Sequence, residues 1–208
     1  GDREGFVLGD IGPFGGLMEP YGEITRAEVD RAFAEQAGAL VEAGADAIIV
    51  ETQTVLDEAG AAIAAAKAAG APCVIASMAF DLTHETRELR TMMGTDPDEA
   101  AAFLEAAGTD VLGLNCGTNI DMASATAAVK RYRDCSGLPI MAQPNAGQPV
   151  LQNLKVIYNQ TPDEMASQAD DMFLAGVDIL GACCGSTPAH IAGLRDRLNH
   201  FIETKNIG

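Results

Sequence analysis

The chain has 208 residues, 48% hydrophobic and 21% charged, so it is long and apolar enough for one globular domain with a sizeable core. Its 30 acidic residues outnumber its 13 basic residues and give a formal net charge of −17. A negative field of this size repels phosphate backbones and anionic lipid headgroups, which argues against partners of both kinds, nucleic acids and membrane surfaces.

Nothing in the sequence has the pattern of a membrane span or a secretory signal. No apolar run approaches the ~20 residues that a spanning helix needs. A basic segment followed by a hydrophobic one is also missing at the start. The five cysteines are an odd number and are not spaced like those of a disulfide-stapled secreted domain. The sequence therefore predicts a cytoplasmic protein.

Apolar runs typical of buried strands alternate along the chain with segments that carry helix-start and helix-stop signals. Thr25 and Thr161 each stand three residues before a glutamate, the spacing of a capping box. This alternation indicates a parallel sheet with helices outside it. We expect a loop at residues 144–149, followed by an irregular stretch to Gln160. Strands are predicted at residues 5–11, 47–50, 73–80, 111–116, 139–143 and 178–182, and helices at about 25–44, 57–69, 96–108, 122–133, 161–176 and 187–202.

An internal repeat relates three of the predicted turns. The helix ends Ala43–Asp46, Ala107–Asp110 and Ala175–Asp178 share an Ala-Gly-x-Asp pattern and are spaced 64 and 68 residues apart. Each spacing equals two βα units, so the three turns precede alternate strands. In a (β/α)8 barrel, alternate strands contribute side chains to the same layer, and the chemistry lies at their C-terminal ends. The residues that end these three strands are therefore expected on one face: Glu51, Cys116 and the pair Cys183–Cys184.

The predicted fold is α/β, of the (β/α)8 TIM-barrel type, but only six βα units can be counted. A complete barrel has eight units and typically about 250 residues. Three interpretations account for the shortfall: two N-terminal βα units are missing, a second chain supplies them, or the fold is an open six-stranded sheet. We favour the first interpretation, in which residues 1–208 form one N-terminally incomplete barrel domain.

Cys116, Cys183 and Cys184 end two of these apolar runs, and a glycine follows each run. Three sulfur ligands with an open fourth position are typical of a zinc site. Adjacent cysteines point to opposite faces of a regular strand, so both reach one ion only where the strand ends and the chain turns. The alternative is that the cysteines are small buried hydrophobic residues, the interpretation that we give to Cys73 and Cys135.

These sequences resemble the homocysteine S-methyltransferase family, which includes betaine–homocysteine methyltransferase and the homocysteine-binding module of cobalamin-dependent methionine synthase. The resemblance covers essentially the whole chain, and the cysteine-bearing stretches are its most specific part. The family's glycine-rich first-strand segment, which helps to bind the amino acid, has no counterpart before Gly1. The matching segments are Gly9–Pro13, Glu51–Thr52, Ala76–Ser77, Gly113–Cys116, Pro144–Gly147 and Cys183–Gly185.

The resemblance implies a zinc-containing (β/α)8 barrel that methylates the sulfur of homocysteine. Cys116, Cys183 and Cys184 match the family's zinc ligands, with the homocysteine thiol as the fourth. Glu51 matches the acid that holds the substrate amine, although it can also be a strand-end cap or an ion-pair partner. Asn145 matches an asparagine near the metal, although it can simply shape its turn. Ser77, also at a strand end, is a further candidate for substrate binding, with packing as its alternative.

The predicted function is thus zinc-dependent transfer of a methyl group to homocysteine, giving methionine. The donor is a small molecule or a separate corrinoid protein, since no D-x-H-x-x-G cobalamin signature occurs in the sequence. One alternative is a non-catalytic metal-binding or partner subunit of a split methyltransferase complex. Another is a phosphate-binding barrel enzyme that uses the loops after the last two strands. A homo-oligomer and a complementing chain both stay open as assemblies.

Overall fold

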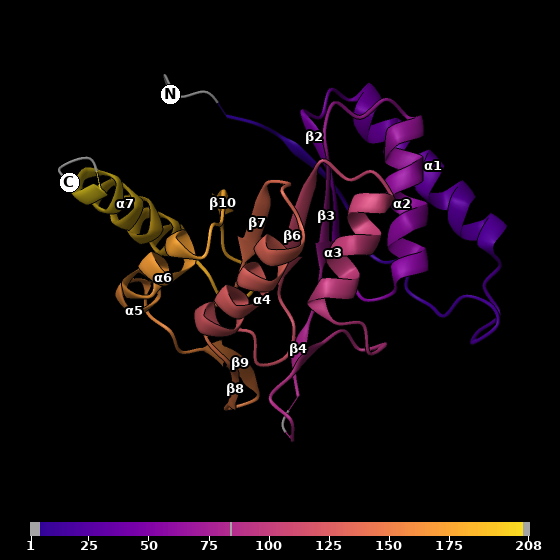
Figure 1. Cartoon of the computed structure of the whole chain (residues 1–208). Helices are drawn as coiled ribbons and strands as arrows, with labels where there is room; N and C mark the ends of the chain where they lie inside the picture. The colour runs from indigo at the N-terminus through magenta and orange to yellow at the C-terminus, as the bar shows by residue number, and fades with distance from the viewer. Residues whose placement is uncertain (1–4, 84, 206–208) are drawn as a thin grey trace.

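The computed structural model describes residues 5–83 and 85–205, and its main feature is an open sheet of six parallel strands (Figure 1). The strand order is β1-β2-β3-β6-β7-β10, so β1 and β10 form the two edges and the barrel is not closed. The predicted α/β class and parallel sheet are confirmed. The strands are β1 (Leu8–Ile11), β2 (Ala47–Gln53), β3 (Val74–Met78), β6 (Val111–Asn115), β7 (Ile140–Gln143) and β10 (Ile179–Leu180).

Helices connect the strands, and their starts follow the predicted capping signals. Thr25 and Thr161 both form complete capping boxes, and the Asp96 carboxylate accepts a hydrogen bond from the Glu99 amide. No helix in the described ranges is both long and apolar enough to cross a bilayer. The helices are α1 (Arg26–Glu42), α2 (Leu56–Ala68), α3 (Pro97–Ala106), α4 (Met122–Cys135), α5 (Pro162–Ser167), α6 (Ala169–Leu174) and α7 (Pro188–Lys205).

The two faces of the sheet bury different side chains, because successive residues of a strand point to opposite sides. Ile48 and Val50 of β2 belong to the main core, which includes the buried faces of α1 to α4. The intervening Ile49 faces the other side, where it belongs to a smaller buried cluster with Ile75, Val111 and Met141. The continuously apolar strands of the sequence are thus explained by burial on both faces.

The repeated Ala-Gly-x-Asp turns have one structural role in all three copies. The Asp46 carboxylate accepts a hydrogen bond from the Val7 amide, the Asp110 carboxylate from Val74, and the Asp178 carboxylate from Ile140. Each aspartate amide in turn donates to the carbonyl of the same partner at 2.8 to 2.9 Å. The repeat therefore ties the start of each alternate strand to the start of its neighbour, and this fixes the register of the pairs β1–β2, β3–β6 and β7–β10.

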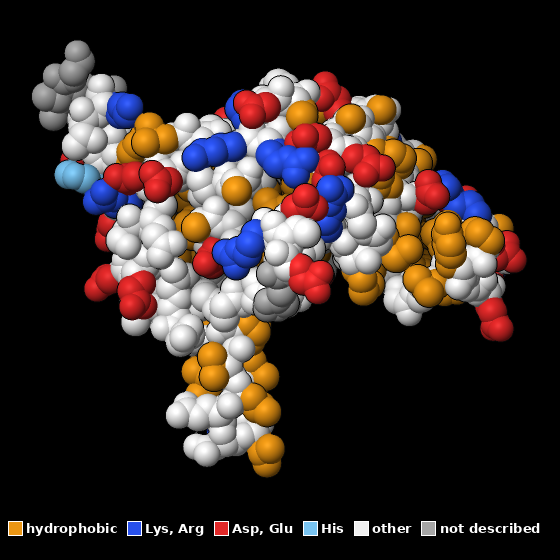
Figure 2. All heavy atoms as spheres, turned by 60° about the horizontal axis from the view of Figure 1, so that its bottom comes forward, with side chains coloured by type: hydrophobic (Ala, Val, Ile, Leu, Met, Phe, Trp, Pro, Cys, Tyr) orange, Lys and Arg blue, Asp and Glu red, His pale blue; other side chains and the backbone are white. Residues whose placement is uncertain are grey.

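The expectation of an irregular stretch between Pro149 and Gln160 is wrong. Most of this segment forms an antiparallel hairpin of β8 (Pro149–Gln152) and β9 (Lys155–Tyr158). Its two turn residues, Asn153 and Leu154, have φ values of 50° and 62°, the left-handed conformation of a type I′ hairpin turn. The hairpin projects from the body of the molecule, and hydrophobic side chains are exposed along it (Figure 2). A second short hairpin pairs β4 (Asp81–Leu82) with β5 (Leu89–Arg90).

The single helix predicted for residues 161–176 is also divided. It ends as α5 at Ser167 and restarts as α6 at Ala169, with Gln168 between them. The Ser167 hydroxyl donates to the Glu164 carbonyl at 2.8 Å. A serine that bonds back to the preceding turn competes with the helical hydrogen bonds, which accounts for the break.

Candidate metal centre

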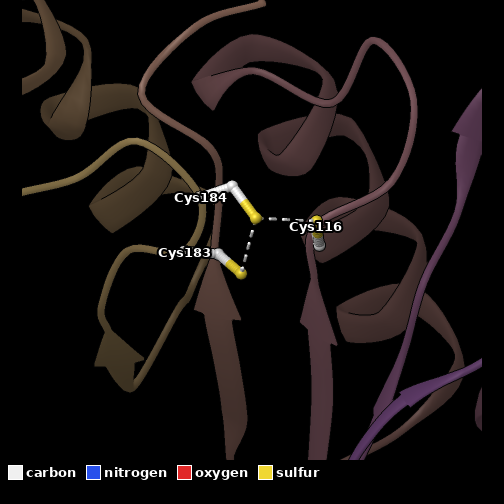
Figure 3. Close-up of side chains that lie close together, drawn as sticks. All are labelled: Cys116, Cys183 and Cys184. Carbon is white, nitrogen blue, oxygen red and sulfur yellow. Dashed lines mark hydrogen bonds between the residues drawn. The ribbon is translucent and has the colours of Figure 1, made fainter. Parts of the chain in front are cut away.

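Three cysteine sulfurs meet at the carboxyl end of the sheet. The Sγ atoms of Cys116, Cys183 and Cys184 all lie within 4.8 Å of one another (Figure 3). Cys116 and Cys184 are 3.6 Å apart, and Cys183 and Cys184 are 4.0 Å apart. Zn–S bonds of about 2.3 Å in a tetrahedral site place sulfurs about 3.8 Å apart. The predicted trio is thus brought together, and two of its three pairs lie near the sulfur–sulfur spacing of a tetrahedral zinc site.

Backbone turns bring the sulfurs to this point. Cys116 follows β6 with φ of 39°, and Gly117 has φ of 105°. A Cβ atom at Gly117 would lie 1.7 Å from the Phe80 carbonyl oxygen, so the first turn requires glycine. Gly185 has φ of 79°, and a Cβ atom there would lie 2.1 Å from the Tyr158 ring. Both glycines therefore allow a left-handed turn and the close approach of another segment.

The residues after β7 join the two cysteine-bearing segments, because β7 lies between β6 and β10 in the sheet. The buried Asn145 donates from Nδ2 to the Gly117 carbonyl at 3.2 Å, and its Oδ1 accepts from the Cys184 amide at 3.2 Å. The Cys183 amide donates to the Pro144 carbonyl at 2.9 Å. Asn145 thus lies beside the sulfurs, as the resemblance implies, and holds the turns that present them.

The thiols of Cys116 and Cys183 differ in pKa. Hydrogen bonding from Cys183 is the main cause that lowers the pKa of Cys116 to about 5, and further hydrogen bonds from Gly117, Cys184 and Asn145 act in the same direction against burial. The hydrogen bond to Cys116 and burial raise the pKa of Cys183. Of these two sulfurs, Cys116 therefore carries the negative charge more easily, and a thiolate is the form that binds metals.

Glu51, on β2, reaches the same end of the sheet. Burial raises its pKa, the nearby charges of Asp10 and Cys116 add to the shift, and a hydrogen bond from Gln143 opposes it. Since Asp10 and Cys116 both act on the Glu51 carboxyl, these groups share one region. The Gln143 Oε1 atom is buried without a partner among the described residues. The sequence predicted the position of Glu51 but assigned no role to Gln143, or to Asp10 within the matching segment Gly9–Pro13.

Ser77 is fully buried, and its hydroxyl donates to Asn115 Oδ1 at 2.7 Å. The same oxygen accepts the Thr52 amide at 3.1 Å, and Asn115 Nδ2 donates to the Thr52 hydroxyl at 2.8 Å. Sequence reasoning did not assign roles to Asn115 and Thr52. The available signal was their position, since each directly adjoins a predicted site residue, Cys116 or Glu51.

The homocysteine S-methyltransferase family model matches residues 2–198. The chain belongs to this family. It is 34% identical to methionine synthase of Mycobacterium tuberculosis over 194 residues and 33% identical to that of Mycobacterium leprae over 193 residues. Each match covers 91% of this chain but only 16% of the methionine synthase.

Solved structures of the homocysteine methyltransferase MmuM from Escherichia coli share the fold of this chain. The apo form matches with a TM-score of 0.68 and 25% identity, and the metallated form with a TM-score of 0.65 and 26% identity. Each comparison covers 92% of this chain, and 62% and 61% of the respective MmuM chains. The TIM-barrel type expected from the sequence is thereby confirmed, whereas the six described strands stay open at both edges.

Proposed function

We propose that the chain transfers a methyl group to the thiol of homocysteine, giving methionine, and that Cys116, Cys183 and Cys184 hold zinc. The observation that carries this proposal is the convergence of three sulfurs, from segments 68 residues apart, in a member of this family. Zinc, when bound, supplies positive charge that favours the thiolate form of a fourth, substrate sulfur. The protein residues position that sulfur and the rest of the amino acid.

Glu51 is proposed to bind the substrate amine. Its carboxyl lies near Cys116 and is partly buried, so a cationic partner would offset the burial that raises its pKa. A bound ammonium group would also supply a donor for the buried Gln143 oxygen. Asn145 would hold the cysteine turns, and a contact of Asn145 or Ser77 with the substrate stays a prediction.

The reaction needs little acid–base chemistry once the acceptor is a thiolate. A direct displacement requires the sulfur and the methyl carbon to be aligned, and the protein contributes by holding both. Sulfonium, betaine and methyl-corrinoid donors would each approach at the carboxyl end of the sheet. The methyl donor, or a separate corrinoid protein that carries it, is therefore proposed to dock at this end.

The experiment that tests the proposal is a titration of zinc-loaded protein with homocysteine. We expect release of about one proton per chain, because metal binding requires the deprotonated thiol. Methionine should then form with at least one of the three donor classes, and Cys184→Ser should abolish both signals. Zinc retention without binding of homocysteine would contradict the proposal and favour a non-catalytic metal-binding subunit.

A further inference from the structure

A buried amide network joins the ends of three strands beside the sulfurs. Asn115, the last residue of β6, is 1% exposed and contacts Thr52 of β2 and Ser77 of β3. Its Oδ1 accepts from the Thr52 amide at 3.1 Å and from the Ser77 hydroxyl at 2.7 Å. Its Nδ2 donates to the Thr52 hydroxyl at 2.8 Å. The side chain is therefore fixed in one orientation by two strands other than its own.

Thr52 has a backbone conformation that needs this support. Its φ of 60° lies in the left-handed region, which a β-branched residue rarely adopts. The pairing of β2 with β3 shifts register between Val50 and Gln53, so Glu51 and Thr52 form an irregularity in the strand. Such bulges redirect a neighbouring side chain and are frequent next to active sites. The two hydrogen bonds between Thr52 and Asn115 hold the strained conformation in place.

The two ends of this contact adjoin the two proposed binding groups. Thr52 follows Glu51 directly, and Asn115 directly precedes Cys116, which itself has φ of 39°. A substitution of Asn115 would thus shift the backbone next to the Glu51 carboxylate and the backbone next to the Cys116 sulfur together. Gly113 leaves the space that Ser77 occupies in this network. A Cβ atom at position 113 would lie 2.7 Å from the Ser77 Cβ, which is too close.

Resting on the function proposed above, we propose that Asn115 is a positioning residue that sets the separation between the Glu51 carboxylate and the Cys116 sulfur. The site is then matched to a substrate whose amine and thiol belong to one small molecule. Asn115 touches neither group of that substrate, and it acts through Thr52 and through its own backbone. The class of ligand selected is an amino thiol of fixed length in preference to a simple thiol.

The test uses the whole chain loaded with Co²⁺, whose absorption changes when a thiolate joins the three cysteine sulfurs. It compares the dissociation constants of homocysteine and of 4-mercaptobutanoate, which has the same thiol and carboxylate but no amine. The wild-type protein should prefer homocysteine. Asn115→Ala should reduce this preference about tenfold or more, an effect typical of a supporting residue. The affinity for 4-mercaptobutanoate should change by no more than about threefold.

Further variants separate positioning from folding. Thr52→Gly accepts the positive φ without strain but lacks the hydroxyl, so it should fold and lose part of the preference, while Thr52→Ser should retain it. Thr109→Val is the matched control. Thr109 precedes the N-terminal end of β6, away from the cysteines, and its buried hydroxyl donates to the Val74 and Val111 carbonyls. Its preference for homocysteine should equal that of the wild-type protein.

A double-variant cycle gives the decisive comparison. If Asn115 acts through Glu51, the double variant Glu51→Ala/Asn115→Ala should show the same preference for homocysteine over 4-mercaptobutanoate as Glu51→Ala alone. Full discrimination in Asn115→Ala would overturn the inference, and so would an equal loss of affinity for both thiols. Failure of the wild-type protein to bind homocysteine at all would instead overturn the proposed function, and this inference with it.

Discussion

The sulfur of Cys184 lies 3.6 Å from the sulfur of Cys116, across 68 residues of sequence. Neither cysteine reaches this position from within a regular strand, because β6 ends at Asn115 and β10 ends at Leu180. The turns that follow the two strands, each stabilised by Asn145, determine the contact. The consequences of this arrangement can be tested at the sulfurs, at the turns and in the sheet that carries them.

The sulfurs of the metal-free protein should differ in reactivity. Since the pKa of Cys116 is lowered to about 5, its alkylation by iodoacetamide should stay fast well below the usual thiol pKa of about 8.5. Cys183→Ala removes the hydrogen bond that is the main cause of the lowered Cys116 pKa, so Cys116 should then react only at higher pH. Cys73, whose pKa is raised by burial, serves as the internal control and should react slowly. Peptide mass spectrometry across a pH series measures each site.

The same pKa predicts a pH dependence of stability without metal. A thiol whose folded pKa is lowered stabilises the protein fully above its unfolded pKa of about 8.5, and this contribution is lost as the pH falls toward about 5. In Cys116→Ser this contribution is missing, so its stability difference from the wild-type protein should shrink as the pH decreases over that range. A difference that grows toward acid pH would contradict the assignment of the thiolate to Cys116.

Asn145→Ala should weaken both the fold and the metal site. The substitution leaves the Gly117 carbonyl and the Cys184 amide without their partner, which costs about 1–3 kcal/mol in the free energy of unfolding. The affinity for zinc should fall about 10- to 100-fold, since supporting residues orient the ligands. Thr126→Val is the control, because among the described residues its buried hydroxyl bonds to Met122 and Met172 and not to the cysteine turns, and it should lose stability with unchanged zinc affinity. Equal zinc affinities in the two variants would contradict a positioning role.

Gly185→Ala should be more destabilising than Gly44→Ala. Both residues have positive φ, of 79° and 87°, so an alanine at either position incurs a backbone cost of about 1–2 kcal/mol. At Gly44 a Cβ atom meets open space, whereas at Gly185 it would overlap the Tyr158 ring at 2.1 Å. We therefore expect lost zinc binding and a displaced hairpin only for Gly185→Ala. Chemical denaturation and metal analysis of the two variants provide the comparison, and equal behaviour would disprove the close packing.

The repeated aspartates should contribute unequally to stability. Asp178→Ala removes the acceptor of the Ile140 amide and an ion pair with Arg133 at 2.7 Å. Among the described residues, Asp46→Ala removes only an exposed hydrogen bond from Val7. We expect a loss of about 1–3 kcal/mol for Asp178→Ala and a smaller one for Asp46→Ala, with the double variant additive within about 0.5 kcal/mol. Urea unfolding curves measure all three, and a larger loss at Asp46 would contradict this ranking.

Much of the fold was predictable because its signals are local. The capping boxes at Thr25 and Thr161 and the repeated Ala-Gly-x-Asp turns are short patterns with a direct structural meaning. The repeat also predicted that Glu51 and the cysteines would share one face. The hairpin of β8 and β9 was missed because its type I′ turn is Asn153–Leu154, and leucine is not a residue that predicts positive φ.

The supporting network of the site could not be predicted, because its contacts are long-range. Asn115 bonds to Thr52 across 63 residues and to Ser77 across 38. The positive φ of Thr52 depends on these contacts and not on its own side chain, which disfavours that conformation. A sequence pattern can place a residue at the end of a strand. It cannot state which buried partner its side chain will find there.

The most direct test of the metal centre is the zinc content of the purified chain and of three single variants. We predict about one zinc per chain for the wild-type protein, and a marked loss for Cys116→Ser, Cys183→Ser and Cys184→Ser alike, since all three sulfurs belong to one cluster. Cys135→Ser, at an exposed cysteine outside the cluster, should retain the metal. Full zinc content in any of the three cluster variants would contradict the account.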